Sequence, residues 1–284
     1  MTQKLTLYSP APPFTRLHAL NVRLGELLEE GGLQAEIIPV ALPDSINHIS
    51  TLPAEERALR LPIVTVADLL PAIQCSGPDW HAYSRACPDL KLLASLYDVA
   101  FGMTVRDGVI EHPDDLSEQE IYCPPRPSSV RLLTEALVET GWGLGGRIAY
   151  CDAMPTDLGP AVGRGRLKAT SWNITTLEGD CTTPNHRLMN MHFLPVDAKT
   201  LARLNTGLHF KIGRCEVDGI PLLAFRQGIA VWDETPPEIA EAILQVLTNR
   251  ETGPFFSNAE ALADWPGLPD TYRHPALLSL VGCG

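Results

Sequence analysis

The sequence predicts an α/β protein made of two lobes, and three features of the chain indicate this architecture. A strand, a helix and a second strand follow one another over residues 4–40, which is the order of a βαβ unit with a parallel strand pair. A second unit begins at Ile121 and enters a helix near Pro127. Two extended stretches, near residues 95–105 and 221–232, link the halves and indicate a hinge.

The first half begins with a short strand at residues 4–9, where polar and apolar side chains alternate before prolines end the strand. Leucines recur at helical spacing from Leu17 to Leu28, and Gly31-Gly32 predicts the end of that helix. A further helix is expected from Asp68. The other strands expected in this half lie at residues 35–40, 63–66 and 90–105, and the last is long enough to pass between lobes.

The second half begins with a strand at Ile121–Cys123, a Pro-Pro turn and a helix that ends at Gly141. A final helix starts near Pro236, where Glu238 in the first turn suits the helix dipole. Further expected elements are strands at residues 167–172 and 191–195, a helix at 198–204 and an extended segment at 220–232. Together the elements predict a discontinuous first lobe of residues 1–104 and 222–284 and a second lobe of residues 105–221.

Composition and charge exclude several classes of protein. Hydrophobic residues make up 45% of the chain and charged residues 20%, which is typical of a globular protein. The net charge is -12 and the 22 basic residues are scattered, so no nucleic-acid partner is expected. No apolar run reaches the roughly 18 residues of a membrane helix, so no membrane insertion is expected either.

The amino-terminal segment and the cysteines together predict a cytoplasmic protein. Residues 1–8 lead directly into strand-like alternation, without the apolar stretch of a signal peptide. The chain has seven cysteines, an odd number with irregular spacing, which does not suggest a disulfide framework. The alternative is a periplasmic protein whose signal peptide has been removed.

Four stretches of the chain resemble the TAXI family of solute receptors, which serve TRAP-type transporters and have the type II periplasmic-binding-protein fold. These stretches are Arg23–Leu28, Asp68–Pro78, Cys123–Ser129 with the helix after it, and Phe193–Asp197 with Asp233–Leu247. The resemblance implies two lobes, a hinge of two crossing extended segments, a small-molecule ligand and, for an exported protein, a membrane transporter partner. The chain departs from the family at Arg126-Pro127-Ser128-Ser129, where the family has Gly-Ser-Gly-Thr.

The start of the second-half helix is the first candidate ligand site. Ser128 and Ser129 lie where a strand passes into a helix, and free amides at such a helix start attract a carboxylate or phosphate. Arg126 could add a bidentate contact with a planar carboxylate. The alternative is that Ser128 only caps the helix and Arg126 faces solvent.

Other candidate ligand residues lie at comparable positions of the chain. Thr15 and Arg16 begin the first helix, and Ser9 and Thr65 end strands, where α/β sheets place ligand contacts. Trp172-Asn173 ends a predicted strand, where the indole could wall a ligand and the amide orient it. For each, ordinary capping, strand packing or core packing is the alternative.

Cysteine and histidine residues indicate neither a metal site nor a cofactor site. Cys123 lies beside the helix start, where its pKa could fall and make it a nucleophile, although a small residue that simply fits is the commoner case. Cys181, His186 and His192 lack the spacing of a zinc site, and no dinucleotide or P-loop motif is present. No cofactor is expected.

The sequence therefore favours a protein that binds a small, carboxylate-bearing organic ligand in a cleft between its lobes, as a receptor or carrier. Two alternatives use the same scaffold, because a fold does not determine a function. One is an intracellular lyase or decarboxylase that acts on an organic acid, and the other is a cytoplasmic ligand sensor.

Overall fold

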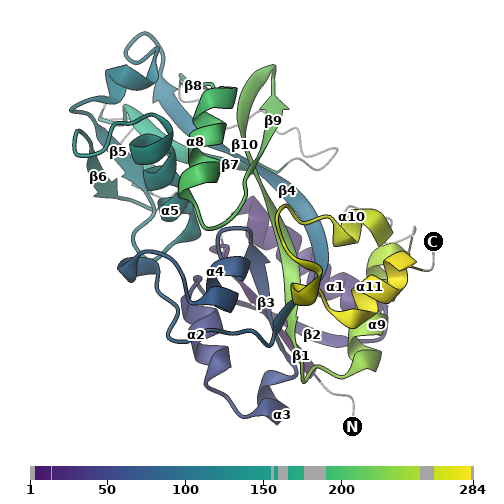
Figure 1. Cartoon of the computed structure of the whole chain (residues 1–284). Coiled ribbons are helices and arrows are strands. Elements are labelled where there is room, and N and C mark those ends of the chain that lie inside the picture. Colours follow the sequence, from purple (N-terminus) through teal and green to yellow (C-terminus); the bar gives the residue numbers. More distant parts are fainter. Residues whose placement is uncertain are drawn as a thin grey trace. The chain divides into compact units, whose positions relative to one another are not determined.

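The structure, a computed structural model, describes residues 4–13, 15–154, 157–158, 166–175, 190–249 and 259–282 (Figure 1). The chain divides into two compact units. Unit 1 comprises Met1–Tyr97 and Arg226–Gly284, and unit 2 comprises Asp98–Phe225.

Unit 1 is an α/β unit built on three parallel strands. Strands β1 (Lys4–Ser9), β2 (Gln34–Pro39) and β3 (Arg60–Thr65) lie in the order β2-β1-β3, as the predicted βαβ unit requires. Strand β10 (Ile220–Trp232) pairs with β3 in the antiparallel direction. The helices of this unit are α1 (Arg16–Glu30), α2 (Asp44–Ser50), α3 (Ala54–Arg57), α4 (Leu69–Gln74), α9 (Pro237–Thr248), α10 (Ala259–Ala263) and α11 (Pro275–Gly282), with 3-10 turns at Asp79–His81 and Asp270–Tyr272.

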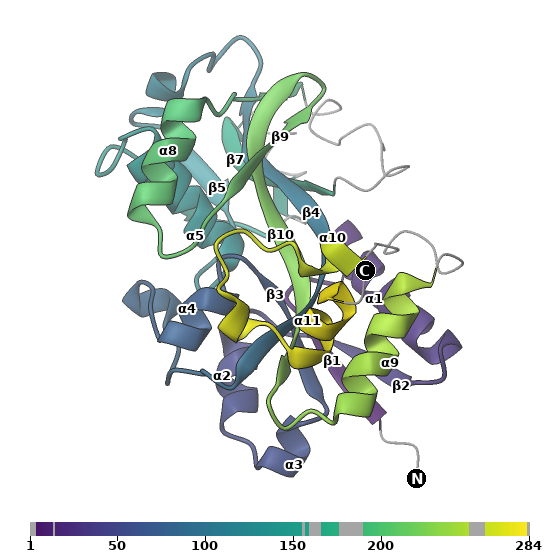
Figure 2. The same ribbon diagram turned by 45° about the vertical axis from the view of Figure 1, so that its right-hand side comes forward.

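The first helix follows from its sequence. The Thr15 hydroxyl accepts a hydrogen bond from the amide of His18 and so caps α1, while the Gly31 amide closes the other end on the carbonyl of Leu27 at 3.0 Å. The leucines at helical spacing form the buried face of α1. Helix α9 packs against α1 and α11, and α10 packs against α11 (Figure 2).

Unit 2 has a sheet of mixed direction. Its strand order is β4-β7-β5-β6, in which β5, β6 and β7 are parallel and β4 runs antiparallel to β7. The strands are β4 (Leu90–Arg106), β5 (Glu120–Cys123), β6 (Ala149–Asp152), β7 (Ala169–Thr175), β8 (Met191–Phe193) and β9 (Gly213–Val217), with β8 paired to β4 and β9 to β10. The helical segments are η2 (Pro113–Leu116), α5 (Ser129–Glu135), the π-helical continuation η3 (Ala136–Gly141) and α8 (Ala198–Gly207).

Two long strands connect the units. Unit 1 gives way to unit 2 within β4, between Tyr97 and Asp98, and the chain returns within β10, between Phe225 and Arg226. The two extended segments expected from the sequence are therefore continuous strands that each belong to both units. Strand β7 differs from its prediction, because it begins at Ala169 and continues to Thr175, so that Trp172 and Asn173 lie inside the strand.

Candidate ligand-binding site

An open pocket of about 630 Å³ lies in unit 2 at the carboxyl ends of two parallel strands. It is lined by Arg126, Arg131, Tyr150, Cys151 and Asp152. Strands β5 and β6 end together, because Cys123 is paired with Asp152 in the register, and the turn after β5 carries Arg126. Ligands of open α/β sheets bind outside the carboxyl ends of the strands, which makes this pocket the first candidate.

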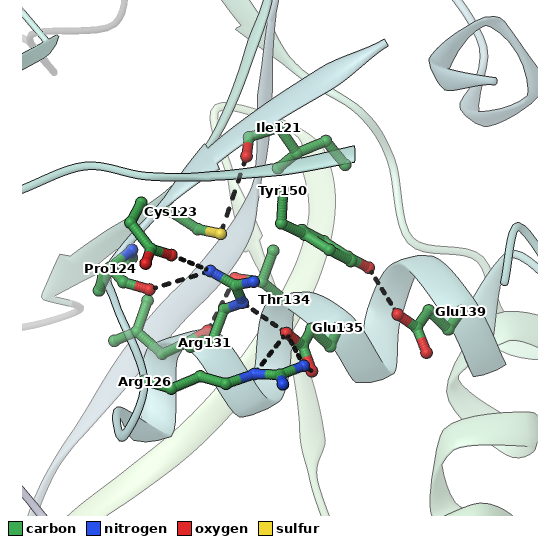
Figure 3. Close-up of polar contacts among 11 residues, drawn as sticks. Ile121, Cys123, Pro124, Arg126, Arg131, Thr134, Glu135, Glu139 and Tyr150 are labelled. Atoms are coloured by element: carbon green, nitrogen blue, oxygen red, sulfur yellow. Dashed lines mark hydrogen bonds and ion pairs between the residues drawn. The ribbon is translucent and has the colours of Figure 1, made fainter. Parts of the chain in front are cut away.

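Glu135 holds the two guanidinium groups of the pocket (Figure 3). Arg126 donates to both Glu135 carboxylate oxygens through Nη2, at 2.7 and 2.8 Å, and Arg131 donates to Oε1 through Nε. Arg131 also donates through Nη1 to Asp152 Oδ1 at 2.8 Å and lies 4.7 Å from the centre of the Tyr150 ring. Two positive and two negative side chains thus form one network, in which each charge has an opposite partner.

The network has a buried side and an exposed side. The side chain of Arg131 is 7% exposed and that of Glu135 is 10% exposed, whereas those of Arg126 and Asp152 are 46% and 65% exposed. Tyr150 donates from its hydroxyl to Glu139 at 3.1 Å (Figure 3), and burial together with Glu139 raises the pKa of this phenol. An entering anion would therefore meet Arg126 and Asp152 first.

Of the predicted site residues of the turn, Arg126 lines this pocket, whereas Ser128 and Ser129 are not among its lining residues. Ser128 precedes α5 with an extended backbone (φ -157°, ψ 133°), and its side chain makes no capping hydrogen bond. Ser129 is the first residue of α5. The fork of Arg126 is occupied by Glu135, so bidentate binding of a ligand by Arg126 would need an exchange of partners.

Cys123 does not have the lowered pKa that its position near a helix suggested. Its side chain is buried, and burial raises the pKa of the thiol to about 11, although Arg131 acts in the opposite direction. The buried position therefore does not support a nucleophilic Cys123, because removal from water outweighs the nearby positive charge, and contact of Cys123 with a ligand stays a prediction.

We expect Cys123 to resist alkylation in the folded protein. With a pKa of about 11, only about one thiol in a thousand is ionised near pH 8. Iodoacetamide should label the exposed Cys75 within minutes and Cys123 only after unfolding, as read by peptide mass analysis. Equal labelling of both cysteines in the native protein would contradict the burial argument.

Strand β7 carries a row of polar side chains on one face, which we call the β7 polar row: Ser171, Asn173 and Thr175. Alternate residues of a strand share a face, so these three point the same way. The Ser171 and Thr175 hydroxyls and the Asn173 Oδ1 are buried, and among the described residues they have no hydrogen-bond partner. Ser171 and Thr175 were not predicted as site residues, although the alternation of the strand could have indicated them.

The strand register places the β7 polar row on the face of the sheet that carries Tyr150. Ile121 of β5 is level with both Tyr150 of β6 and Ala169 of β7, so these side chains share a face. Ser171, Asn173 and Thr175 follow Ala169 on that face. Because Tyr122 is level with Thr170, β7 continues past the end of β5, and Asn173 and Thr175 lie beyond it.

Trp172 points to the opposite face of β7. It packs against two clusters of buried residues, which include Leu167 and Met191 in one and Phe193 and Leu222 in the other. Trp172 and Asn173 were predicted to act together, but adjacent strand residues face opposite ways, so the structure does not bring them together. The indole packs within the unit, and a ligand role for Trp172 or Asn173 stays a prediction.

The predicted ligand residues of unit 1 belong to internal hydrogen-bond networks. The Ser9 hydroxyl accepts from Asn21 Nδ2 at 2.9 Å, and the Tyr97 hydroxyl donates to Asn21 Oδ1 at 3.1 Å. Thr65 donates to the buried carboxyl group of Asp68. Ser9 and Thr65 are thus engaged inside the unit, and their contact with a ligand stays a prediction.

The two residues predicted at the start of α1 have different surroundings. Thr15 is the cap of the helix, since its hydroxyl accepts from the His18 amide at 3.2 Å and donates to the Pro12 carbonyl at 2.7 Å. Arg16 is exposed as the first helical residue. A ligand role for either residue stays a prediction.

Among the residues that the structure describes, no three His, Cys, Asp or Glu side chains are grouped as metal ligands. His192 instead contacts Asp107 through Nδ1 at 2.7 Å, while Cys181 and His186 lie outside the described residues. No helix in the described ranges is both long and apolar enough to cross a membrane.

No protein-family model and no curated protein matches this sequence. Solved structures do match over almost the whole chain. A Rhodopseudomonas palustris protein, Rpa4515 with adipate, has a TM-score of 0.61 at 17% identity, with 99% of this chain and 94% of that chain covered. MatC from the same organism, with bound malate, has a TM-score of 0.58 at 11% identity and covers 98% of this chain and 94% of its own.

A third structure, described as a periplasmic transporter, has a TM-score of 0.58 at 13% identity over 98% of this chain and 92% of that chain. Together these matches and the two units joined by β4 and β10 define the class: the chain has the two-lobed fold of periplasmic binding proteins. The predicted type II fold with two connecting extended segments is confirmed. The resemblance to the narrower TAXI family is not tested by these matches.

The predicted cytoplasmic location is contradicted by the same comparison. Two of the matching structures are described as a periplasmic transporter and as the periplasmic binding protein BugD, and they point to the periplasm instead. The prediction depended on the amino-terminal residues and on free cysteines. The free cysteines do not determine the compartment, because a domain of this size folds without disulfides wherever it is located.

Proposed function

We propose that this protein is a solute-binding protein that binds a small organic carboxylate and does not convert it chemically. The observation that carries the proposal is the likeness of fold: this chain, with its two units joined by two long strands, matches structures that contain adipate and malate with TM-scores of 0.61 and 0.58. The two units would be the two lobes. Their boundaries at 97/98 and 225/226 lie near the predicted lobe boundaries at 104/105 and 221/222, and β4 and β10 would be the hinge.

The charged pocket of unit 2 supports the choice of a carboxylate. Two guanidinium groups lie at the carboxyl ends of β5 and β6, and one partner of Arg131, Asp152, is 65% exposed. An ion pair with such an exposed member contributes only about 0–1 kcal/mol, so a ligand carboxylate can replace Asp152 at small cost. The start of α5 at Ser128 and Ser129 would add backbone amides.

The narrower assignment is a receptor of the TAXI type, with a TRAP-type membrane transporter as its partner. The stretches Arg23–Leu28 and Cys123–Ser129 support this assignment. The replacement of the family's Gly-Ser-Gly-Thr by Arg126-Pro127-Ser128-Ser129 adds a cation to the turn. We infer that the ligand therefore carries at least one carboxylate.

A thermal-shift panel of adipate, malate, succinate and neutral analogues tests this function. A true ligand at a hundredfold excess over its Kd should stabilise the protein by about 2.7 kcal/mol and be recovered unchanged by mass analysis. Stabilisation by neutral or cationic compounds alone would refute the carboxylate proposal. Consumption of the acid would favour the lyase or decarboxylase alternative.

Arg126→Gln should weaken binding of the acid found in the panel. Loss of one charged hydrogen-bonding group in the pocket is expected to raise the Kd about tenfold to a hundredfold, measured by titration calorimetry. Arg147→Gln is the matched control, because Arg147 is exposed in the same unit and donates to the Gly143 carbonyl. An unchanged Kd for Arg126→Gln would remove this residue from the site.

A further inference from the structure

The β7 polar row has hydrogen-bonding capacity that the described part of the protein does not use. Ser171 and Thr175 are 7% and 8% exposed, and their hydroxyl oxygens, like Asn173 Oδ1, have no partner among the described residues. Buried polar groups are nearly always hydrogen-bonded, and one without a partner destabilises the fold. Three such atoms at alternate positions of one strand need an explanation.

The strand neighbours of the row account for its burial and leave its polarity unexplained. The residues level with Ser171, Asn173 and Thr175 on β4 are Met103, Phe101 and Val99, and all three are fully buried and apolar. Side chains directly opposite in a sheet share a face, so apolar side chains at these three positions of β7 would have packed well against their β4 neighbours. By contrast, Thr170 on the other face of β7 donates to the Tyr122 carbonyl at 2.8 Å.

The row also extends in the direction where a ligand is expected. Ser171 is level with the end of β5, and Thr175 lies four residues further along. At about 3.3 Å per residue, the row reaches about 13 Å past that end. It thus leads from the end of β5 to the edge of the sheet where α/β proteins hold their ligands, on the same face as Tyr150.

The chemistry of the three oxygens defines what they can bind. Asn173 Oδ1 only accepts hydrogen bonds, whereas each hydroxyl can donate or accept. A bare carboxylate offers acceptors alone, so it can use Ser171 and Thr175 but does not satisfy Asn173 Oδ1 in the amide orientation of this structure. A hydroxyl or ammonium group on the ligand supplies the donor that this oxygen requires.

We propose that the β7 polar row binds the hydroxyl groups of the ligand, so that this protein prefers hydroxylated carboxylic acids to their unsubstituted analogues. The inference rests on the proposed function and adds specificity to it. The charged pocket binds the carboxylate, and Asn173 with the Ser171 and Thr175 hydroxyls binds the hydroxyl groups along the carbon chain of the ligand. Successive members of the row lie about 6.6 Å apart, so a longer polyhydroxylated acid engages more of them than a short one.

Affinities within two series of acids test this preference. The four-carbon series is succinate, malate and tartrate, and the six-carbon pair is adipate and galactarate, so that only hydroxyls differ within each. We expect the Kd to fall about tenfold for each hydroxyl that is engaged, measured by titration calorimetry. If acids bind but hydroxyls bring no gain in either series, this inference fails and the proposed function stands. If no acid binds, the proposed function fails as well.

Substitutions separate ligand binding from a structural role. Thr175→Val keeps the shape of the side chain and removes an unpartnered hydroxyl, so the free protein should gain about 2–4 °C in Tm while the preference for the hydroxylated acid is lost. Asn173→Leu should abolish the same preference. Affinity and stability are thus expected to change in opposite directions.

Thr170→Val is the matched control on the same strand. It removes a hydroxyl that has a partner, so it should lower the Tm and leave the ratio of the malate and succinate dissociation constants unchanged. If Thr175→Val lowers the Tm, or leaves that ratio at its original value, the oxygen has a structural partner and the inference is overturned.

Discussion

Replacing Asp68 by alanine is expected to lower the free energy of unfolding by about 3–5 kcal/mol. The Asp68 carboxyl group is fully buried, accepts hydrogen bonds from Thr65 and from the Tyr83 hydroxyl at 3.1 Å, and contacts His81 Nε2 at 3.0 Å. Removing it leaves three buried polar groups without this partner. Urea unfolding followed by circular dichroism measures the change.

Two further variants make this prediction decisive. Tyr83→Phe removes only one of the three contacts, so it should disturb folding less than Asp68→Ala does. It should lower the free energy of unfolding by about 1–2 kcal/mol. Asp79→Ala removes an exposed aspartate of the neighbouring turn and should stay within about 0.5 kcal/mol of the parent protein. If Asp68→Ala is as mild as Asp79→Ala, the network around Asp68 does not stabilise unit 1.

Gly228→Ala is expected to destabilise the protein by about 2–3 kcal/mol through overpacking. A Cβ atom at this position of β10 would lie 2.6 Å from the Ala94 carbonyl oxygen of β4 and 2.6 Å from the Trp265 ring. The backbone oxygen has no rotamer by which to move away, so strand β4 or β10 must shift. The decrease in Tm and in urea midpoint gives the size of the effect.

Gly213→Ala is the control for the glycine substitution. A Cβ at Gly213 would have the Ala224 carbonyl oxygen as its nearest neighbour at 3.5 Å, which is an ordinary contact. An alanine there should be neutral or slightly stabilising, because glycine loses more backbone entropy on folding. Similar losses at both positions would contradict the argument from close strand contact.

Much of the fold could be predicted because it depends on local patterns. Helix α9 was recognised from Pro236 and Glu238 at its start, β4 from a long apolar stretch without a turn signal, and β10 as an extended segment. Strand β7 was misjudged at its carboxyl end, since nothing in the local sequence after Trp172 shows that β4 continues beside it.

The candidate site was less predictable. Arg126 was expected at the pocket and lines it, but Arg131 was missed. In the sequence, Arg131 and Glu135 are an ordinary helical pair at i and i+4, of the kind usually found on a surface. Only folding adds Asp152, 21 residues away, and the Tyr150 ring, and so turns the pair into the centre of a network.

The sequence by itself determined the order of strands and helices, the two long connecting segments and the arginine-bearing turn at the start of α5, because spacing and turn residues act over a few positions. Only the tertiary structure decided the burial of the Cys123 thiol, the partners of Arg126 and the burial of the β7 polar row. These properties depend on removal from water and on groups brought together from distant strands. No local pattern contains that information, because burial and charge pairing are set by the sheet as a whole.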